Sequence, residues 1–409
     1  MLLRNKTLLR NIDWYIVLIY IFIIFFGYMN LYSVSSEKAE KQLIWIIFSF
    51  ICIILVFLFQ PIHYKYFSPF FFLFTLFLLI GVFFFGKNIN GSKSWYIFGP
   101  ISFQPSELSK ISTSLILAHI MSQENFKKNK KILFYIFIIL FTPFILIFFQ
   151  PDPGSSIVFF SFILTLYREG LSIFFLFYIL IFIFLFILSL NFSFWIIILA
   201  LFFIFLLLFL IKKNNLFYYI FYFIFFSFFV FISPFFYQKC LKKHHKDRIN
   251  ILFKNEFDRK YRENVGYNLL YSKTALGSGK FFGKGYKKGT ITKGKFVPEQ
   301  HTDYIFCTVG EEWGFIGSIG LIIFYLLFIS RIYFLSERQR DIFVRIFGYS
   351  VGNILLIHFL INLGMVMGLF PTIGIVLPFF SYGGSSFWSF TILVFIFIRL
   401  DISNQTNLI

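Results

Sequence analysis

The sequence predicts an all-α, polytopic membrane protein, and its composition and its apolar runs both indicate this class. Hydrophobic residues make up 59% of the 409-residue chain and charged residues only 13%, whereas a soluble domain has about 25% charged residues. Apolar runs close to the ~20 residues that cross a bilayer as a helix recur along the chain. Because exposed backbone polar groups are not tolerated in lipid, these runs are expected to form a transmembrane helical bundle.

The apolar runs predict about twelve spans in a single integral membrane domain, residues 1–409. The runs cover residues 14–34, 43–61, 68–86, 106–123, 132–150, 154–168, 171–190, 193–211, 216–236, 313–334, 343–364 and 384–400. The run at 154–168 is short and the turns that follow it are tight. The number of spans between residues 154 and 236 therefore stays open.

Basic residues in the short loops predict the orientation of the chain. If the N-terminus is cytoplasmic, the basic segments 127–131, 212–213 and 336–340 all lie inside, as the positive-inside rule requires. The first outer loop is balanced, because Glu37 and Glu40 offset Lys38 and Lys41. Both termini are then expected in the cytoplasm, and the long polar, lysine-rich loop at 237–312 is expected outside the cell.

The charge and the unusual residue usage restrict the class of partner. The formal charge of +19 indicates contact with anionic lipid headgroups or with an anionic substrate. No nucleic-acid-binding motif accompanies it, so nucleic acid is the weaker interpretation.

The chain contains 70 phenylalanines. Many of them are interpreted as filling lipid-facing positions. The three cysteines show no metal-ligand spacing, and a disulfide between Cys240 and Cys307 stays open.

Polar clusters lie at the ends of two early spans. Glu107 and Lys110 are three residues apart and share a helix face. An ionisable residue inside a span is a functional candidate, although a first-turn carboxylate also simply favours the helix dipole. Trp95, in the loop before them, has the properties of an interfacial anchor. Asp152 stands between two prolines, where it would form a rigid corner or cap the next helix.

The long loop ends in a second group of polar residues. Asp303, in the run 301–303, lies near the expected outer boundary, where a carboxylate could serve as the general base for a headgroup hydroxyl. A helix cap or a solvated loop acid is the alternative. The segment 277–285 lacks the spacing of a phosphate-binding loop, so a flexible glycine-lysine loop is expected. The segment 364–386 is dense in glycine and proline, which predicts irregular backbone against protein or a wet cavity.

Taken together, these segments resemble the SEDS family (shape, elongation, division and sporulation). The matching segments, all in family order, are 91–95, 103–107, 150–152, 272–279, 298–303 and 371–386. One such motif would be a weak signal, but the ordered set is highly specific. Residues 371–378 look more like the elongation branch of the family than its division branch. The sequence departs from the family pattern at Pro153, Tyr271 and Lys280, where leucine, glutamine and glycine are usual.

The resemblance implies a peptidoglycan glycosyltransferase in the bacterial cytoplasmic membrane. Such an enzyme polymerises lipid II, a disaccharide-peptide on undecaprenyl diphosphate, at the outer face. By resemblance, Asp303 matches the family's essential acid and is expected to be catalytic. The expected substrate contacts are Trp95, Glu107, Lys110, Asp152, Lys273, His301 and Ser381.

The resemblance also implies a partner and a span count. The expected partner is a class B penicillin-binding protein, which is a transpeptidase. No metal site can be recognised in the sequence, and a divalent cation at the diphosphate stays open. The family commonly has ten spans, so twelve imply an additional hairpin within residues 171–211. A lipid II flippase and a non-catalytic scaffold for a cell-wall synthase remain as alternative functions.

Overall fold

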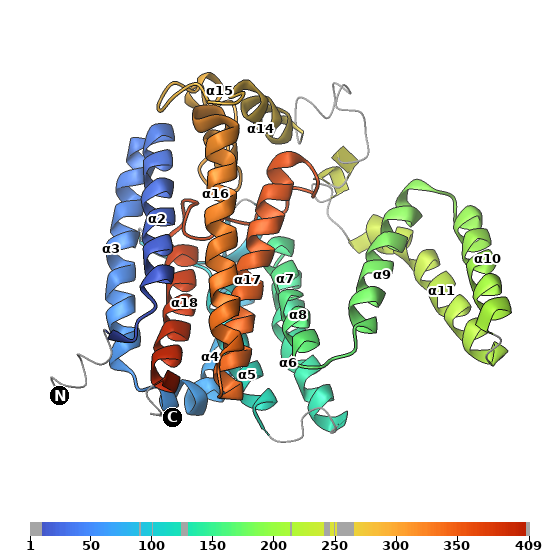
Figure 1. Ribbon diagram of the computed structural model, residues 1–409. Helices are drawn as coiled ribbons and strands as arrows, with labels where there is room; N and C mark the ends of the chain where they lie inside the picture. The colour runs from blue at the N-terminus through green and yellow to red at the C-terminus, as the bar shows by residue number, and fades with distance from the viewer. Residues whose placement is uncertain are drawn as a thin grey trace. The chain divides into compact units, whose positions relative to one another are not determined.

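The structure is a computed structural model that describes residues 10–89, 91–99, 101–123, 130–212, 215–240, 246–248, 250–251 and 266–405. The chain divides into two compact units. The first comprises Met1–Gly170 with Asn255–Ile409, and the second is Leu171–Lys254. The two units are described separately (Figure 1).

The first unit is a bundle of long helices with a small antiparallel sheet at one end. Its elements, in chain order, are α2 (Trp14–Val34), α3 (Ser36–Leu58), α4 (Pro61–Phe85), β1 (Lys87–Ile89), β2 (Ser92–Phe98), β3 (Ile101–Phe103), α5 (Pro105–Met121), α6 (Lys130–Phe149), α7 (Pro153–Val158), α8 (Ser161–Arg168), α14 (Tyr267–Ser278), α15 (Thr290–Lys293), α16 (Ile305–Glu337), α17 (Ile342–Met367) and α18 (Gly384–Gln405).

The second unit contains three consecutive helices that pack on one another. These are α9 (Phe174–Asn191), α10 (Phe194–Lys212) and α11 (Leu216–Cys240). Their shared core is apolar and contains Leu185, Ile197, Leu201, Phe226 and Val230. The extra hairpin predicted within 171–211 corresponds to α9 and α10, and its status as an addition to the family core stays a prediction.

The predicted all-α, polytopic class is confirmed. Nine helices within the described ranges are long and apolar enough to cross a membrane. The remaining predicted spans correspond to α5, to α9 and to the broken pair α7–α8. These three segments are shorter, so whether each crosses the bilayer stays a prediction.

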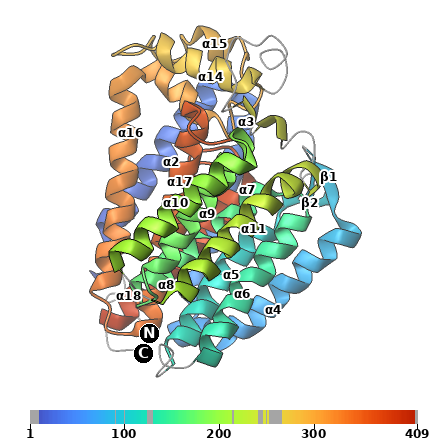
Figure 2. The same cartoon turned by 90° about the vertical axis from the view of Figure 1, so that its right-hand side faces the viewer.

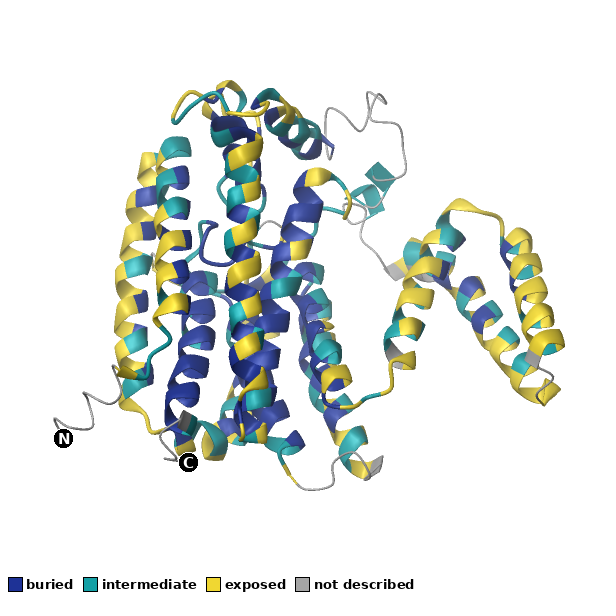
Figure 3. Cartoon of the chain, in the orientation of Figure 1, coloured by how far each residue is buried: buried dark blue, intermediate teal, exposed yellow. Residues whose placement is uncertain are grey.

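The centre of the first unit is formed by α5, α17 and α18, whose residues are buried on most sides. Figure 3 shows α17 and α18 largely buried and α3 with a broad exposed side. On α4, Phe70, Phe77 and Phe84 are spaced by seven residues and all face outward. The opposite face of α4 is buried, and its Thr75 hydroxyl pairs with Ser112 of α5 at 2.6 Å. These phenylalanines support the interpretation that much of the phenylalanine is lipid-facing.

Two predicted loops are shorter than the sequence suggested. The charged segment 37–41 is not a loop, because Ser35 caps α3 and the helix already includes it. The outer loop predicted at 237–312 is helical at both ends, because α11 continues to Cys240 and α16 begins at Ile305, and its place outside the membrane stays a prediction. Hydropathy placed the starts of α3 and α16 too late and the end of α11 too early. Polar residues in the terminal turns of these helices lower the apolar signal there.

The glycine-lysine segment 277–285 is ordered, which corrects the expectation of a flexible loop. Helix α16 is kinked at Gly314, with φ 66°, and the kink interrupts its internal hydrogen bonds. The segment supplies the missing partners: its carbonyls at 280 and 281 accept from the N–H groups of 315 and 316, at 2.9 and 3.2 Å. Its N–H groups at 284 and 285 donate to the carbonyls of 311 and 312, at 3.0 and 2.9 Å.

Candidate active site

Asp303 lies in a turn whose backbone is fixed at three consecutive carbonyls. The carbonyls of residues 301–303 accept hydrogen bonds, in order, from the backbone N–H of Tyr382 at 2.9 Å, the hydroxyl of Ser381 at 2.7 Å and the side-chain amide of Asn362 at 2.8 Å. Two of these donors lie in the irregular segment that precedes α18, and the third lies on α17. Residues far apart in the sequence therefore determine where the Asp303 carboxylate is placed.

The Asp303 carboxylate faces Gly374 in the irregular segment 368–383. A Cβ added at Gly374 would lie 3.6 Å from Asp303 Oδ2, and the φ of Gly374 is 80°. The other side of this segment is covered by the start of α7. A Cβ added at Gly154 would lie 2.5 Å from the carbonyl oxygen of Ile373. Glycine at both positions lets the two chains and the carboxylate approach closely. The predicted irregular backbone at 364–386 is confirmed for residues 368–383, whereas the two ends of that range belong to α17 and α18.

Asp152 caps α7, as the sequence predicted, and also links α7 to the start of α5. Its Oδ1 accepts the backbone N–H of Ser155 at 3.1 Å, and its Oδ2 accepts the Gln104 amide at 2.6 Å and the Ser155 hydroxyl at 2.9 Å. Burial raises the pKa of Asp152, whereas the hydrogen bonds from Ser155 lower it. The acid is therefore part of a buried polar link beside the segment that faces Asp303.

Glu107 and Lys110 form a buried ion pair in α5. Lys110 Nζ lies 2.9 Å from Glu107 Oε1, and the two side chains are only 2% and 5% exposed. Lys110 also contacts Nε2 of His358, on α17, at 3.0 Å and lies 4.8 Å from the ring centre of Phe390, on α18. Lys110 therefore joins the three central helices. The shared helix face predicted from the spacing of Glu107 and Lys110 is confirmed.

Trp95 lies on β2 and is half-buried. The antiparallel sheet has the order β1–β2–β3, and Trp95 pairs with Lys87 of β1. Figure 2 shows β1 and β2 beside the upper end of α4. On the other edge, Phe103 of β3 stacks on Trp388 of α18, with ring centres 5.9 Å apart. Among the described residues, no hydrogen bond or ring contact joins Trp95 to the Asp303 turn.

His301 contacts a lysine that the sequence analysis did not select. Lys38, in the first turn of α3, lies with Nζ 2.5 Å from Nε2 of His301. Burial lowers the pKa of His301, and the positive charge of Lys38 lowers it further. Near neutral pH the imidazole is therefore uncharged and accepts a hydrogen bond from the ammonium group. In the sequence Lys38 belonged to a charge-balanced loop, so only the fold reveals its position.

The other two predicted substrate contacts have different surroundings. Ser381 is buried, and its hydroxyl accepts the N–H of Leu377 at 2.9 Å while donating to the Asp303 turn. It therefore positions the backbone around Asp303. Lys273 lies on α14, where its Nζ is 3.0 Å from the Cβ position of Gly368, just beyond the end of α17.

Glu311 is a second structural residue that the sequence analysis did not select. Its carboxylate accepts the backbone N–H groups of residues 290–292, at 2.8 to 2.9 Å, and pairs with Lys284 at 2.7 Å. Glu311 thus attaches the short helix α15 to the start of α16. Figure 1 shows α14 and α15 together at one end of the bundle.

Cysteines and metal ligands form no cluster in the part of the chain that the structure describes. Cys52 and Cys307 are buried free thiols. Over the same residues, no group of three or more His, Cys, Asp or Glu side chains has the arrangement to hold a metal ion.

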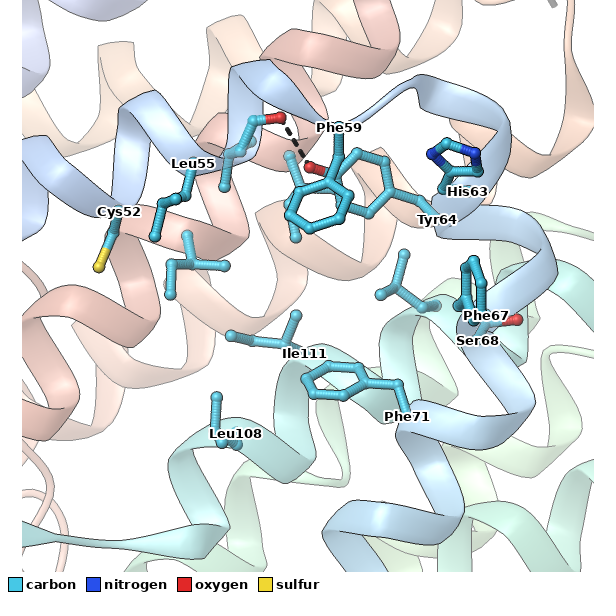
Figure 4. A pocket seen from close by; sticks show the side chains of 14 residues that line it. Cys52, Leu55, Phe59, His63, Tyr64, Phe67, Ser68, Phe71, Leu108 and Ile111 are labelled. Carbon is cyan, nitrogen blue, oxygen red and sulfur yellow. Dashed lines mark hydrogen bonds between the residues drawn. The ribbon is translucent and has the colours of Figure 1, made fainter.

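A separate apolar cavity of 430 Å³ lies between α3, α4, α5 and α18. Its walls include Leu55 of α3, Phe59 just after α3, Phe71 of α4 and Ile111 of α5 (Figure 4). The Tyr64 hydroxyl donates to the carbonyl of Val56 at 2.8 Å. The lining is mostly apolar, and its titratable groups are Cys52, His63 and Tyr64.

Comparison with known proteins assigns the family. A family model described as a cell cycle protein, FtsW/RodA/SpoVE, matches residues 10–195 and 167–406, which together cover most of the chain. The chain belongs to the FtsW/RodA/SpoVE family. The SEDS resemblance identified from the ordered motifs is therefore confirmed.

Members of both branches of the FtsW/RodA/SpoVE family are similar to this chain. The peptidoglycan glycosyltransferase MrdB of Escherichia coli K12 is 27% identical over 92% of this chain and 90% of its own length. The peptidoglycan glycosyltransferase RodA of Treponema pallidum is 27% identical over 87% of this chain and 88% of its own length. The probable peptidoglycan glycosyltransferase FtsW of Buchnera aphidicola subsp. Baizongia pistaciae is 30% identical over 89% of this chain and 83% of its own length.

Solved structures of the FtsW/RodA/SpoVE family share the fold. The crystal structure of the rod shape determining protein RodA of Thermus thermophilus matches with a TM-score of 0.63 and 20% identity, over 96% of this chain and 97% of that chain. A chain from a structure described as showing the coordination of polymerization and crosslinking by a peptidoglycan synthase complex matches with a TM-score of 0.70 and 22% identity. That match covers 95% of this chain and 97% of the other.

Proposed function

We propose that this protein is a peptidoglycan glycosyltransferase that polymerises lipid II at the outer face of the cytoplasmic membrane during cell elongation. The observation that carries the proposal is the placement of Asp303. Its backbone is fixed by donors from two other segments, its carboxylate faces Gly374, and helix α16 begins just after it at Ile305. Similar proteins named peptidoglycan glycosyltransferase cover most of the chain.

The reaction needs a base, a leaving group and a positive charge. The 4-hydroxyl oxygen of the acceptor sugar attacks the anomeric carbon of the donor, and a new C–O bond forms as the bond to the diphosphate breaks. Asp303 takes the hydroxyl proton as the attack develops. The diphosphate leaves with the electron pair of the broken bond, and a nearby cationic group stabilises the charge that develops on it.

The buried residues around Asp303 position the reacting groups. The link from Asp152 to Gln104 holds the starts of α7 and α5 together. The Glu107–Lys110 pair and His358 connect α5 to α17. A rigid surround keeps the base aligned with its proton, because the benefit of a positioned base depends on its geometry.

We also propose a class B penicillin-binding protein as the partner. Polymerisation and crosslinking are separate chemistries, and this chain has no folded aqueous domain of transpeptidase type within its described residues. The similar chain with a TM-score of 0.70 comes from a complex described as coordinating both reactions. Co-purification with a transpeptidase after gentle solubilisation is the expected result, and full activity of a solitary protein in native membranes would contradict the proposal.

The decisive experiment is polymerisation by the purified protein. The protein in lipid nanodiscs is incubated with fluorescently labelled lipid II, and the products are separated by gel electrophoresis. A ladder of glycan polymer is expected. A flippase or a scaffold would leave lipid II unpolymerised, so absence of polymer from a well-folded protein, with and without added transpeptidase, would overturn the proposed activity.

A further inference from the structure

The Asp303 turn has a cation beside it that forms no salt bridge among the described residues, although Glu299 and Glu37 attract it at longer range. Lys38 forms no salt bridge with any described residue, and its contact is with the uncharged imidazole of His301 at 2.5 Å. The nearest acids have other partners. Glu37 pairs with Lys41 at 2.7 Å, and Glu299 accepts the Thr302 hydroxyl at 2.9 Å.

Two other lysines of this region are less suited to hold an anion. Lys110 is paired with Glu107 and only 2% exposed. Lys284 is paired with Glu311, whose carboxylate is completely buried. An anion at either site would compete with an existing carboxylate. Lys38 is half-buried, and no described carboxylate forms a salt bridge with it.

The position of Lys38 is also fixed. Lys38 is the third residue of α3. Its ammonium charge therefore adds to the positive potential at the N-terminal end of the helix dipole. Its Nζ lies 6.0 Å from the ring centre of Tyr382, whose backbone N–H holds the carbonyl of His301. Lys38 thus lies beside the turn that carries Asp303 and beside the segment before α18 that helps to hold this turn.

We propose that Lys38, oriented by His301, binds the diphosphate of the lipid-linked donor. This inference rests on the proposed function, because it names the group that stabilises the leaving diphosphate in that reaction. A diphosphate is a strong hydrogen-bond acceptor, and an ammonium group binds it as a point charge.

The test measures binding without turnover. Farnesyl diphosphate and farnesol, which differ only in the diphosphate, are titrated into nanodisc-embedded protein. Lys38→Gln is expected to weaken farnesyl diphosphate about tenfold or more, the scale of a lost charge-assisted hydrogen bond, and to leave farnesol unchanged. Lys38→Arg should retain most of the affinity. The matched control is Lys293→Gln, which removes an exposed lysine from α15 and should change neither ligand.

The outcomes separate the inference from the proposed function. Unchanged farnesyl diphosphate binding by Lys38→Gln, equal loss of both ligands, or no binding by the unmodified protein would each overturn the role of Lys38. Lysine-dependent binding without any polymerisation of lipid II would overturn the glycosyltransferase activity and leave the diphosphate site standing. In the polymerisation assay, Lys38→Gln is expected to raise KM for lipid II more strongly than Lys293→Gln does.

Discussion

At the residue scale, the positions of the polar side chains explain why so few of them are candidates for chemistry. Glu107, Lys110 and Asp152 are buried. Asp303 is only half-buried, and its backbone is held while its carboxylate faces a glycine. A proton acceptor needs this combination of a fixed position and access to substrate.

The Asp303→Asn substitution tests the general base. Asparagine keeps the size and most of the hydrogen bonding of aspartate but cannot accept the proton, and losing a positioned base typically costs ~10²–10⁴ in rate. Polymerisation should therefore collapse in the lipid II assay, while folding and lipid II binding persist. Asp152→Asn is the matched control and should cost less if the acid mainly caps α7. Near-normal polymer yield from folded Asp303→Asn would remove this residue from the mechanism.

The buried ion pair of α5 gives a prediction about stability. Lys110→Met leaves the carboxylate of Glu107 without its cation, and breaking a buried pair in this way costs about 3–5 kcal/mol. The double substitution Glu107→Gln with Lys110→Met removes both charges and should be markedly milder. The measurement is the thermal unfolding temperature in detergent. Equal destabilisation by the single and the double variant would show that the loss comes from packing and not from the unpaired charge.

At the scale of elements, the kink in α16 explains the composition of the segment 277–285. The kink frees backbone groups of α16, and only a chain with little side-chain bulk approaches closely enough to satisfy them. A Cβ at Gly279 would lie 1.9 Å from the carbonyl oxygen of Gly310. The glycines therefore serve close packing, which the sequence pattern could not distinguish from flexibility.

Lys280 gives a test of this arrangement. Its φ is 51°, a left-handed conformation that costs a non-glycine residue roughly 1–2 kcal/mol. Lys280→Gly should therefore raise the unfolding temperature or leave it unchanged. Gly283→Ala is the opposite case, because the new Cβ would lie 2.2 Å from the carbonyl oxygen of Glu312, and it should lower the unfolding temperature. A lower temperature for Lys280→Gly would contradict this account.

At the scale of the whole molecule, hydropathy predicts where the helices lie but not how they meet. The twelve apolar runs all correspond to helical segments because apolar length is a local property. The contact of Lys38 with His301 and the attachment of α15 by Glu311 join segments that are distant in the sequence. Such contacts have no local signal. The sequence identified Asp303 as a candidate because it belongs to an ordered set of motifs. The hydrogen bonds that hold the carbonyls of residues 301–303 could not be predicted from it.

The sidedness of α10 remains to be tested, and two asparagines flank this helix. Asn191 ends α9, and Asn215 immediately precedes α11. If α10 crosses the bilayer with both termini of the protein in the cytoplasm, Asn191 lies outside and Asn215 inside. Single cysteines at these positions, introduced into a variant without Cys52, Cys240 and Cys307, are treated with a membrane-impermeant maleimide in intact cells.

The cysteine at position 191 should label in intact cells, and the one at 215 only after the membrane is permeabilised. Lys293→Cys, on α15 at the end of the bundle that carries the Asp303 turn, is the control and should label from outside. If positions 191 and 215 label from the same side, α10 does not cross the bilayer, and α9 and α10 do not form a transmembrane hairpin. Reversed labelling of all three positions would instead overturn the orientation, because the basic loops would then face outward against the positive-inside rule.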